Sequence, residues 1–111
     1  MATSVRALQI GHLDLLIALE DAIGCAGWSA KQFLDELQHP DAQILGAFGD
    51  DVLVGYVSVR RFVDEAWILQ LGVHPNQRRH GVARSLLQAA FDAARNWNIT
   101  SLWLEVRVSN D

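Results

Sequence analysis

Residues 70–84 have the types and the spacing needed to bind an anion. The stretch, QLGVHPNQRRHGVAR, runs from an apolar, strand-like segment through a polar loop into a helical pattern. The first N–H groups of a helix lack internal partners and carry partial positive charge. Gly81 and Ala83 are small, so an anionic ligand can approach the backbone there. Three arginines add positive charge: Arg78, Arg79 and Arg84. The stretch predicts a cradle for a phosphate or pyrophosphate.

Other phosphate and metal motifs do not fit this stretch. No Gly-Lys-Ser/Thr follows, so it is not a Walker loop, and the G-x-G-x-x-G spacing of dinucleotide-binding proteins is absent. His74 and His80 flank the loop, but no third ligand lies at a useful spacing, so no metal site is predicted. A helix start beside a solvated basic loop would give the same pattern, because strand–loop–helix junctions are common.

Composition limits the class of protein. The 111 residues fit one domain, and 50% hydrophobic with 20% charged residues is typical of a globular chain. The net charge of −4 argues against a nucleic-acid partner, because phosphate backbones require a basic face. The single cysteine, Cys25, excludes an internal disulfide. Apolar runs are too short to span a membrane and no signal peptide is visible, so we expect a cytoplasmic protein without a membrane partner.

Apolar periodicity predicts eight elements in the order β-α-α-β-β-β-α-β. The expected strands cover residues 5–10, 43–48, 52–60, 66–73 and 100–108, and the expected helices cover residues 12–23, 29–39 and 81–97. An antiparallel meander followed by a strand–helix–strand crossover gives an α+β fold, with a mixed, mostly antiparallel sheet flanked by helices.

Local signals predict where these elements begin and end, and which side chains are buried. Ser29 and Gln32 form a predicted capping box, Gly24 ends the first helix, and residues 49–51 form a tight turn. In the first helix the acidic residues are expected opposite the apolar face: Asp14, Glu20 and Asp21. The four tryptophans are expected in the core: Trp28, Trp67, Trp97 and Trp103.

The cradle and several other segments resemble the GCN5-related N-acetyltransferases (GNAT), which bind acetyl-CoA. Residues 78–83, RRHGVA, fit the family signature Q/R-x-x-G-x-G/A, with Ala83 at the third small position. Other segments are similar to the bacterial ribosomal-protein-alanine N-acetyltransferases of the RimI type: VHP at 73–75, RSLL at 84–87, LWLEVRVSN at 102–110 and WS at 28–29, with Gly27 in place of a proline. The resemblance covers nearly the whole chain.

The resemblance implies a single acetyltransferase domain over residues 1–111, with acetyl-CoA as cosubstrate and no metal. The backbone of Leu71, Gly72 and Val73 would hold the pantetheine arm and the acetyl carbonyl. The pyrophosphate would be bound by Arg79, His80, Gly81, Val82, Ala83 and Arg84, with Arg78 beside them and Asn110 contacting the cofactor. Glu105 matches the general base, and the acceptor would be the N-terminal α-amine of a ribosomal protein.

Other interpretations of the same residues stay open. Glu105 could be a cross-strand ion-pair partner, since structural carboxylates also occur in strands. The chain could be a vestigial module that binds acyl-CoA without turnover. It could also acetylate a small amine such as a polyamine or an aminoglycoside.

The chain departs from the family after its fifth predicted strand. In the family, Ser-Asn precedes a helix with a Leu-Tyr pair, whose tyrosine is the general acid, and two more strands. This chain stops at Asp111, and Tyr56 does not match that motif position. We therefore expect a C-terminally incomplete domain with weak turnover. We also expect a homo-oligomer formed through the apolar edge strand 102–108, on which Leu102, Leu104, Val106 and Val108 alternate.

Overall fold

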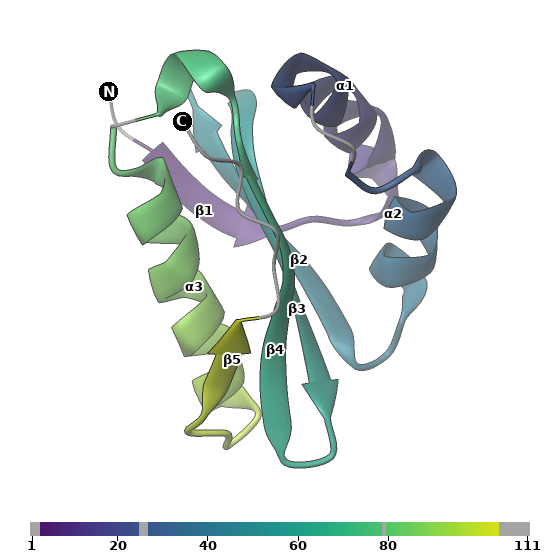
Figure 1. The fold of residues 1–111 in the computed structure, drawn as a ribbon, viewed down its shortest axis with the longest axis vertical. Helices are drawn as coiled ribbons and strands as arrows, with labels where there is room; N and C mark the ends of the chain where they lie inside the picture. The colour runs from purple at the N-terminus through teal and green to yellow at the C-terminus, as the bar shows by residue number, and fades with distance from the viewer. Residues whose placement is uncertain (1–2, 25–26, 79, 105–111) are drawn as a thin grey trace.

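A computed structural model describes residues 3–24, 27–78 and 80–104. Its sheet has the spatial order β1-β2-β3-β4-β5, and helices pack on both faces (Figure 1). The strands are β1 (Thr3–Ala7), β2 (Ala42–Gly49), β3 (Val52–Phe62), β4 (Glu65–Val73) and β5 (Leu102–Leu104). The helices are α1 (Leu13–Ile23), α2 (Ala30–Gln38) and α3 (Val82–Asn96), and two 3-10 turns are η1 (Ile10–His12) and η2 (Pro75–Gln77).

The strand pairing confirms the predicted α+β fold. β1 to β4 pair antiparallel with their neighbours in chain order. After the crossover through α3, β5 pairs in parallel with β4. The sheet is therefore mixed but mostly antiparallel, as the order of the predicted elements implied.

The sheet separates two apolar cores. α3 covers one face, where Leu86 and Ala90 are fully buried, and α1 and α2 cover the other face (Figure 1). On the α1–α2 face, Phe33 of α2 packs edge-to-face on Tyr56 of β3, with ring centroids 5.3 Å apart. The apolar stripe predicted for the last helix is thus the side that faces the sheet.

The predicted capping box at the start of α2 is present. The Gln32 N–H donates to the Ser29 hydroxyl at 3.2 Å, and the Ser29 N–H donates to the Gln32 side chain at 2.8 Å. These contacts pair two N–H groups at the start of the helix that would otherwise lack acceptors.

Replacing Ser29 by alanine is expected to lower the free energy of unfolding by about 1 kcal/mol, because one capping contact is lost. Urea denaturation measures this effect. Ser4→Ala in the exposed part of β1 is the control and should change the midpoint little. Equal midpoints for Ser29→Ala and wild type would contradict the importance of the cap.

The predicted ends of α1 and of the first hairpin are also confirmed. Gly24, with φ +76°, ends α1 in the left-handed region, where glycine has no steric penalty. Asp50 and Asp51 form the turn between β2 and β3, and both have positive φ. Two consecutive left-handed residues match the twist that a two-residue hairpin requires.

The first strand differs from its prediction. It covers Thr3–Ala7 rather than residues 5–10, and the chain then turns through η1 into α1. The Gln9 N–H donates to His12 Nδ1 at 2.9 Å. This local contact, together with burial of Leu8 under the sheet, stabilises a turn where alternation alone suggested continued strand.

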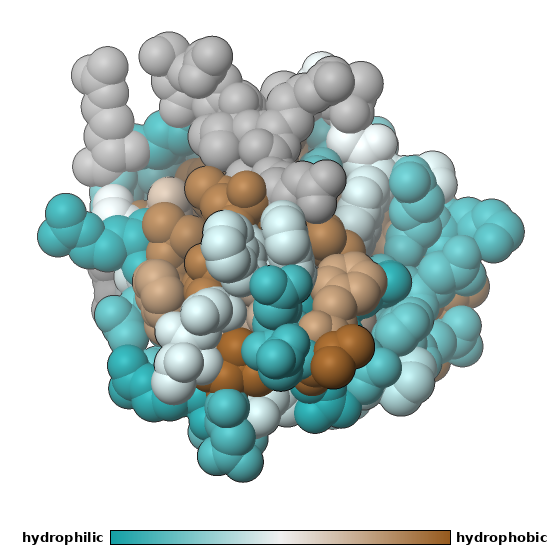
Figure 2. Space-filling view, turned by 60° about the horizontal axis from the view of Figure 1, so that its bottom comes forward, coloured by the Kyte–Doolittle hydropathy of each residue, from teal (hydrophilic) through white to brown (hydrophobic). Residues whose placement is uncertain are grey.

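The prediction that Trp103 lies in the core is wrong. Trp103 is 48% exposed and stacks on Trp67 of β4, with ring centroids 5.7 Å apart. Its neighbour Leu104 is 59% exposed. Figure 2 looks at the end of the molecule that carries β5 and the β3–β4 turn, and hydrophobic side chains gather on that surface. The other tryptophans are half-buried, and Trp28 and Trp97 contact the two cores.

Candidate functional site

The end of β4 and the start of α3 form the candidate site. β4 ends at Val73, η2 follows directly, and α3 begins at Val82. The His74 side chain accepts the Asn76 N–H at 3.1 Å and so shapes the loop locally. The structure thus confirms the strand–loop–helix order that the sequence predicted for residues 70–84.

A bulge in β4 lies just before the predicted pantetheine segment. Ser58 of β3 pairs with Gln70, but the next residue, Val59, pairs with Ile68, so Leu69 has no partner in β3. A bulge bends its strand and redirects the residues that follow it. Pairing between β3 and β4 continues beyond the bulge, and the His74 N–H donates to the Val54 carbonyl at 2.8 Å.

Alternation along β4 decides which backbone groups are available to a ligand. Because His74 donates toward β3, alternate residues point their N–H and C=O groups to the opposite edge. Leu71 and Val73 are those residues. The described pairs between β4 and β5 are Ala66–Leu102, Trp67–Trp103 and Ile68–Leu104, so this ladder lies on the other side of the bulge. The geometry suits a ligand that hydrogen-bonds along the strand edge.

Gly72 lies between Leu71 and Val73 in β4. The space that a side chain at Gly72 would occupy is already filled by other side chains. A Cβ at Gly72 would lie 2.8 Å from both Ile23 Cδ1 and Tyr56 Cε1. Glycine here lets the strand lie directly on the Tyr56 ring. Gly72 is therefore buried on the face of the sheet that α1 and α2 cover. The backbone N–H and C=O groups of Leu71 and Val73 point away from β3.

The N-terminus of α3 is open in the way that an anion cradle requires. Gly81, with φ +78°, precedes the helix, and no side chain caps it. A Cβ built on Gly81 would meet nothing within 4 Å. The first intrahelical bond comes from the Ser85 N–H to the Gly81 carbonyl, so the N–H groups of residues 82–84 have no acceptor in the helix. Such N–H groups bind phosphate oxygens in many proteins.

Among the side chains around the start of α3, one is buried and holds the helix in place, and the others are exposed or half-buried. Val82 is 2% exposed and anchors the first turn to the α3 core. Gly81, Ala83, Arg84 and His80 are exposed, and Arg78 is half-buried in the preceding loop. Arg84 therefore places an exposed cation on the first turn of α3, and the small side chain of Ala83 adds little bulk there. Arg79, Glu105 and Asn110 lie outside the described residues, so their predicted roles stay predictions.

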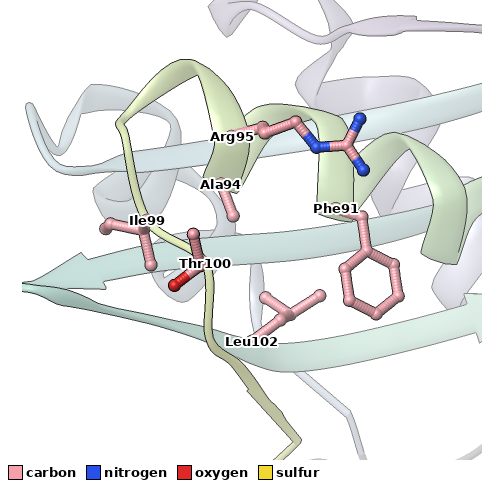
Figure 3. A pocket seen from close by; sticks show the side chains of 6 residues that line it. All are labelled: Phe91, Ala94, Arg95, Ile99, Thr100 and Leu102. Carbon is pink, nitrogen blue, oxygen red and sulfur yellow. The ribbon is translucent and has the colours of Figure 1, made fainter.

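A separate cavity of about 250 Å³ lies at the other end of α3 (Figure 3). It is lined by Phe91, Ala94, Arg95, Ile99, Thr100 and Leu102. Val82 and Ala94 are about 18 Å apart along the helix axis at about 1.5 Å per residue. The cavity is therefore not part of the cradle at the start of α3.

The sequence reasoning missed one buried acidic residue beside this site. Glu20 was expected on the solvent side of α1, but it is only 9% exposed and accepts a hydrogen bond from the Tyr56 hydroxyl at 3.0 Å. Glu20 is buried because α1 packs on the sheet. The apolar periodicity of the helix does not show which single polar residue this packing covers. Glycine at position 27 leaves room for this carboxylate, because a Cβ built there would overlap it.

Two further findings concern the described residues. Among them, no group of three or more His, Cys, Asp or Glu side chains could hold a metal ion. No helix within residues 3–24, 27–78 and 80–104 is both long and apolar enough to cross a membrane.

The relatives of this chain share both its sequence pattern and its fold. Residues 13–111 match the model of the acetyltransferase (GNAT) family. The [ribosomal protein bS18]-alanine N-acetyltransferase of Escherichia coli K12 is 40% identical over 109 residues, which cover 96% of this chain and 72% of that protein. The crystal structure of the ribosomal-protein-S18-alanine N-acetyltransferase from Escherichia coli superposes with a TM-score of 0.86 at 25% identity, covering 98% of this chain and 70% of that one.

A more distant structure shows the same fold. The PaiA N-acetyltransferase from Thermoplasma acidophilum, solved in complex with coenzyme A, has a TM-score of 0.78 at 22% identity and covers 89% of this chain and 76% of that chain. Together with the family match over residues 13–111, these similarities show that the chain belongs to the acetyltransferase (GNAT) family, whose members are acetyl-CoA-dependent N-acetyltransferases.

Proposed function

We propose that this chain transfers an acetyl group from acetyl-CoA to the N-terminal α-amine of a ribosomal protein. The observation that carries the proposal is the uncapped start of α3, where Gly81 has φ +78° and open space above it. The acceptor class rests on relatives named ribosomal-protein-alanine N-acetyltransferase. The proposed acceptor and cosubstrate imply a cytoplasmic protein.

The proposed cosubstrate contacts follow from the two features of the site. N–H groups of residues 82–84 would bind the pyrophosphate, with the Arg84 guanidinium adding charge-assisted contacts and Arg78, Arg79 and His80 in the same loop. The N–H and C=O groups of Leu71 and Val73, on the side of β4 away from β3, would hold the pantetheine arm. Asn110 would add a contact. The open space above Gly81 fits a bulky anion at this position.

The proposed chemistry is direct attack of the amine on the thioester. Acetyl-CoA supplies an activated acetyl group. A C–N bond forms as the C–S bond breaks, so the bound acceptor must lose a proton before it attacks, and the carbonyl must be polarised. Glu105 would accept the proton from the acceptor ammonium, and backbone N–H groups at the end of β4 would polarise the carbonyl oxygen. The nitrogen loses a second proton as the amide forms, and this proton goes to the departing thiolate, so that CoA leaves as the thiol.

A direct experiment separates an enzyme from a binding module. Purified 111-residue protein is titrated with acetyl-CoA by calorimetry and is then incubated with acetyl-CoA and a peptide that begins with alanine. We expect saturable binding, release of free CoA and a peptide mass increase equal to one acetyl group. A peptide with an already acetylated N-terminus is the control. Binding without transfer would support the vestigial acyl-CoA module instead.

We also propose that the chain self-associates through the region of the final strand. The exposure of Trp103 and Leu104 supports this proposal, because monomers seldom leave such large apolar side chains together at a sheet edge. Residues 105–108 lie outside the described residues, so their part in this contact stays a prediction. We expect light scattering to give a mass above 12.3 kDa at high concentration. A stable monomer under those conditions would contradict it.

A further inference from the structure

The buried carboxylate of Glu20 has no cationic partner among the described residues. Glu20 Oε1 accepts a hydrogen bond from the Tyr56 hydroxyl, with 3.0 Å between the two oxygens, and Glu20 is 9% exposed. Glu36, the other buried acidic residue in the described part of the chain, is paired with Arg60, whose Nε donates to Glu36 Oε2 at 3.0 Å. Since a buried charge without a counter-charge is costly, Glu20 is a candidate for a ligand-binding role.

Glu20 lies where two other elements meet. A Cβ built on Gly27 would overlap the Glu20 carboxylate, and the same point is 3.1 Å from Gln70 Nε2. The carboxylate thus fills the place of a side chain at residue 27 and lies beside the amide of Gln70 on β4. Any residue larger than glycine at this position would displace it.

A chain of contacts connects this carboxylate to the proposed acetyl-binding segment. Tyr56 holds Glu20 through its hydroxyl, and the same ring packs against Gly72, as shown by the 2.8 Å approach of Tyr56 Cε1 to a built Cβ. Gln70 precedes that segment by one residue and shares a face of β4 with Gly72, because both pair with alternate residues of β3. The carboxylate therefore lies on the α1–α2 side of the proposed acetyl position.

We propose that Glu20 and Gln70 bind the ammonium group of the acceptor, with Tyr56 as a positioning residue that orients Glu20. This inference rests on the proposed function, since it assigns the amine subsite of that same reaction. A primary ammonium has three N–H donors and a positive charge. Glu20 Oε2 supplies the counter-charge. The Gln70 amide lies nearest through Nε2, and a 180° rotation of that amide supplies its carbonyl as a neutral acceptor. The subsite selects cationic primary amines over neutral acceptors of the same shape.

The alternative is a purely structural hydrogen bond that ties α1 to β3. Glu20→Gln distinguishes the structural role from the binding role. Glutamine has the same size and can still accept a hydrogen bond from the Tyr56 hydroxyl, but it carries no charge. A structural role predicts unchanged acceptor affinity. Binding of the ammonium predicts a higher KM for the acceptor peptide, by about 10- to 100-fold, from loss of a charge-assisted contact.

The experiment measures acceptor affinity separately from cosubstrate affinity. A peptide that begins with alanine is titrated into wild type and Glu20→Gln, each saturated with CoA, and KM is measured with acetyl-CoA. The matched ligand has a hydroxyl in place of the N-terminal amine. We expect Glu20→Gln to weaken only the amine peptide, while its CoA affinity equals that of wild type. Wild-type affinity should also fall as pH rises through about 8, where an α-amine loses its proton, and the variant should lack this dependence.

A second pair of variants keeps the proposal testable if Glu20→Gln folds poorly. Gln70→Leu removes the neutral acceptor, and Tyr56→Phe removes the hydroxyl while leaving the Glu20 charge. Both should raise KM for the amine peptide without changing CoA affinity. Equal amine affinity in wild type and in every well-folded variant would overturn this inference. Failure of the wild type to bind acetyl-CoA at all would instead overturn the proposed function.

Discussion

Gly81→Val is expected to weaken binding of CoA by about 1.5–3 kcal/mol, a loss of about 10- to 150-fold in affinity. Gly81 has φ +78°, a backbone region that β-branched residues rarely adopt, so valine either strains the turn or moves it. Either result changes the N–H groups of residues 82–84 or puts methyl groups in the open space above the turn. Isothermal calorimetry with CoA measures the effect.

Gly24→Val provides a control with matched backbone strain. Gly24 has φ +76° and, like Gly81, has no atom within 4 Å of a built Cβ. Both variants should therefore lose similar stability in urea denaturation, while only Gly81→Val loses CoA affinity. Unchanged CoA affinity in a folded Gly81→Val protein would place the cosubstrate elsewhere.

Glu105→Gln is expected to lower kcat by about 10²- to 10⁴-fold, the usual contribution of a general base. The amide keeps the shape of the side chain but cannot accept the proton of the acceptor ammonium. CoA affinity should stay at the wild-type value, because the proposed role of Glu105 begins only when the amine is bound. Stopped assays of CoA release across pH measure kcat and its dependence on a basic group.

Glu65→Gln is the matched control for loss of a strand carboxylate. Glu65 begins β4 and accepts a hydrogen bond from Trp67 Nε1 at 3.3 Å, away from the proposed site. We expect near wild-type turnover from this variant. If Glu105→Gln also retains full turnover, Glu105 is an ion-pair partner in the strand and another group accepts the proton.

The sequence alone was sufficient for the element order and for most element ends. Residues 81–97 carry a helical apolar stripe and residues 43–73 alternate, because the geometry of each element repeats at 3.6 or 2 residues regardless of its partners. Ser29 and Gly24 mark helix ends through bonds and φ angles within a few residues. The strand–loop–helix junction at residues 70–84 was also predictable from the contiguous sequence, and its role as a phosphate cradle stays a prediction.

Tertiary structure decided which side chains meet across the chain. Glu20 was expected at the surface, yet α1 packs so that its carboxylate meets Tyr56, a residue 36 positions away. Trp103 was expected in the core, yet its place on β5 leaves it stacked on Trp67 and half exposed. The bulge at Leu69 arises from the pairing of β4 with β3, and the apolar alternation of the sequence does not predict it. Local preferences act within a few residues, whereas burial, strand register and the proposed amine subsite depend on contacts that only the folded chain brings together.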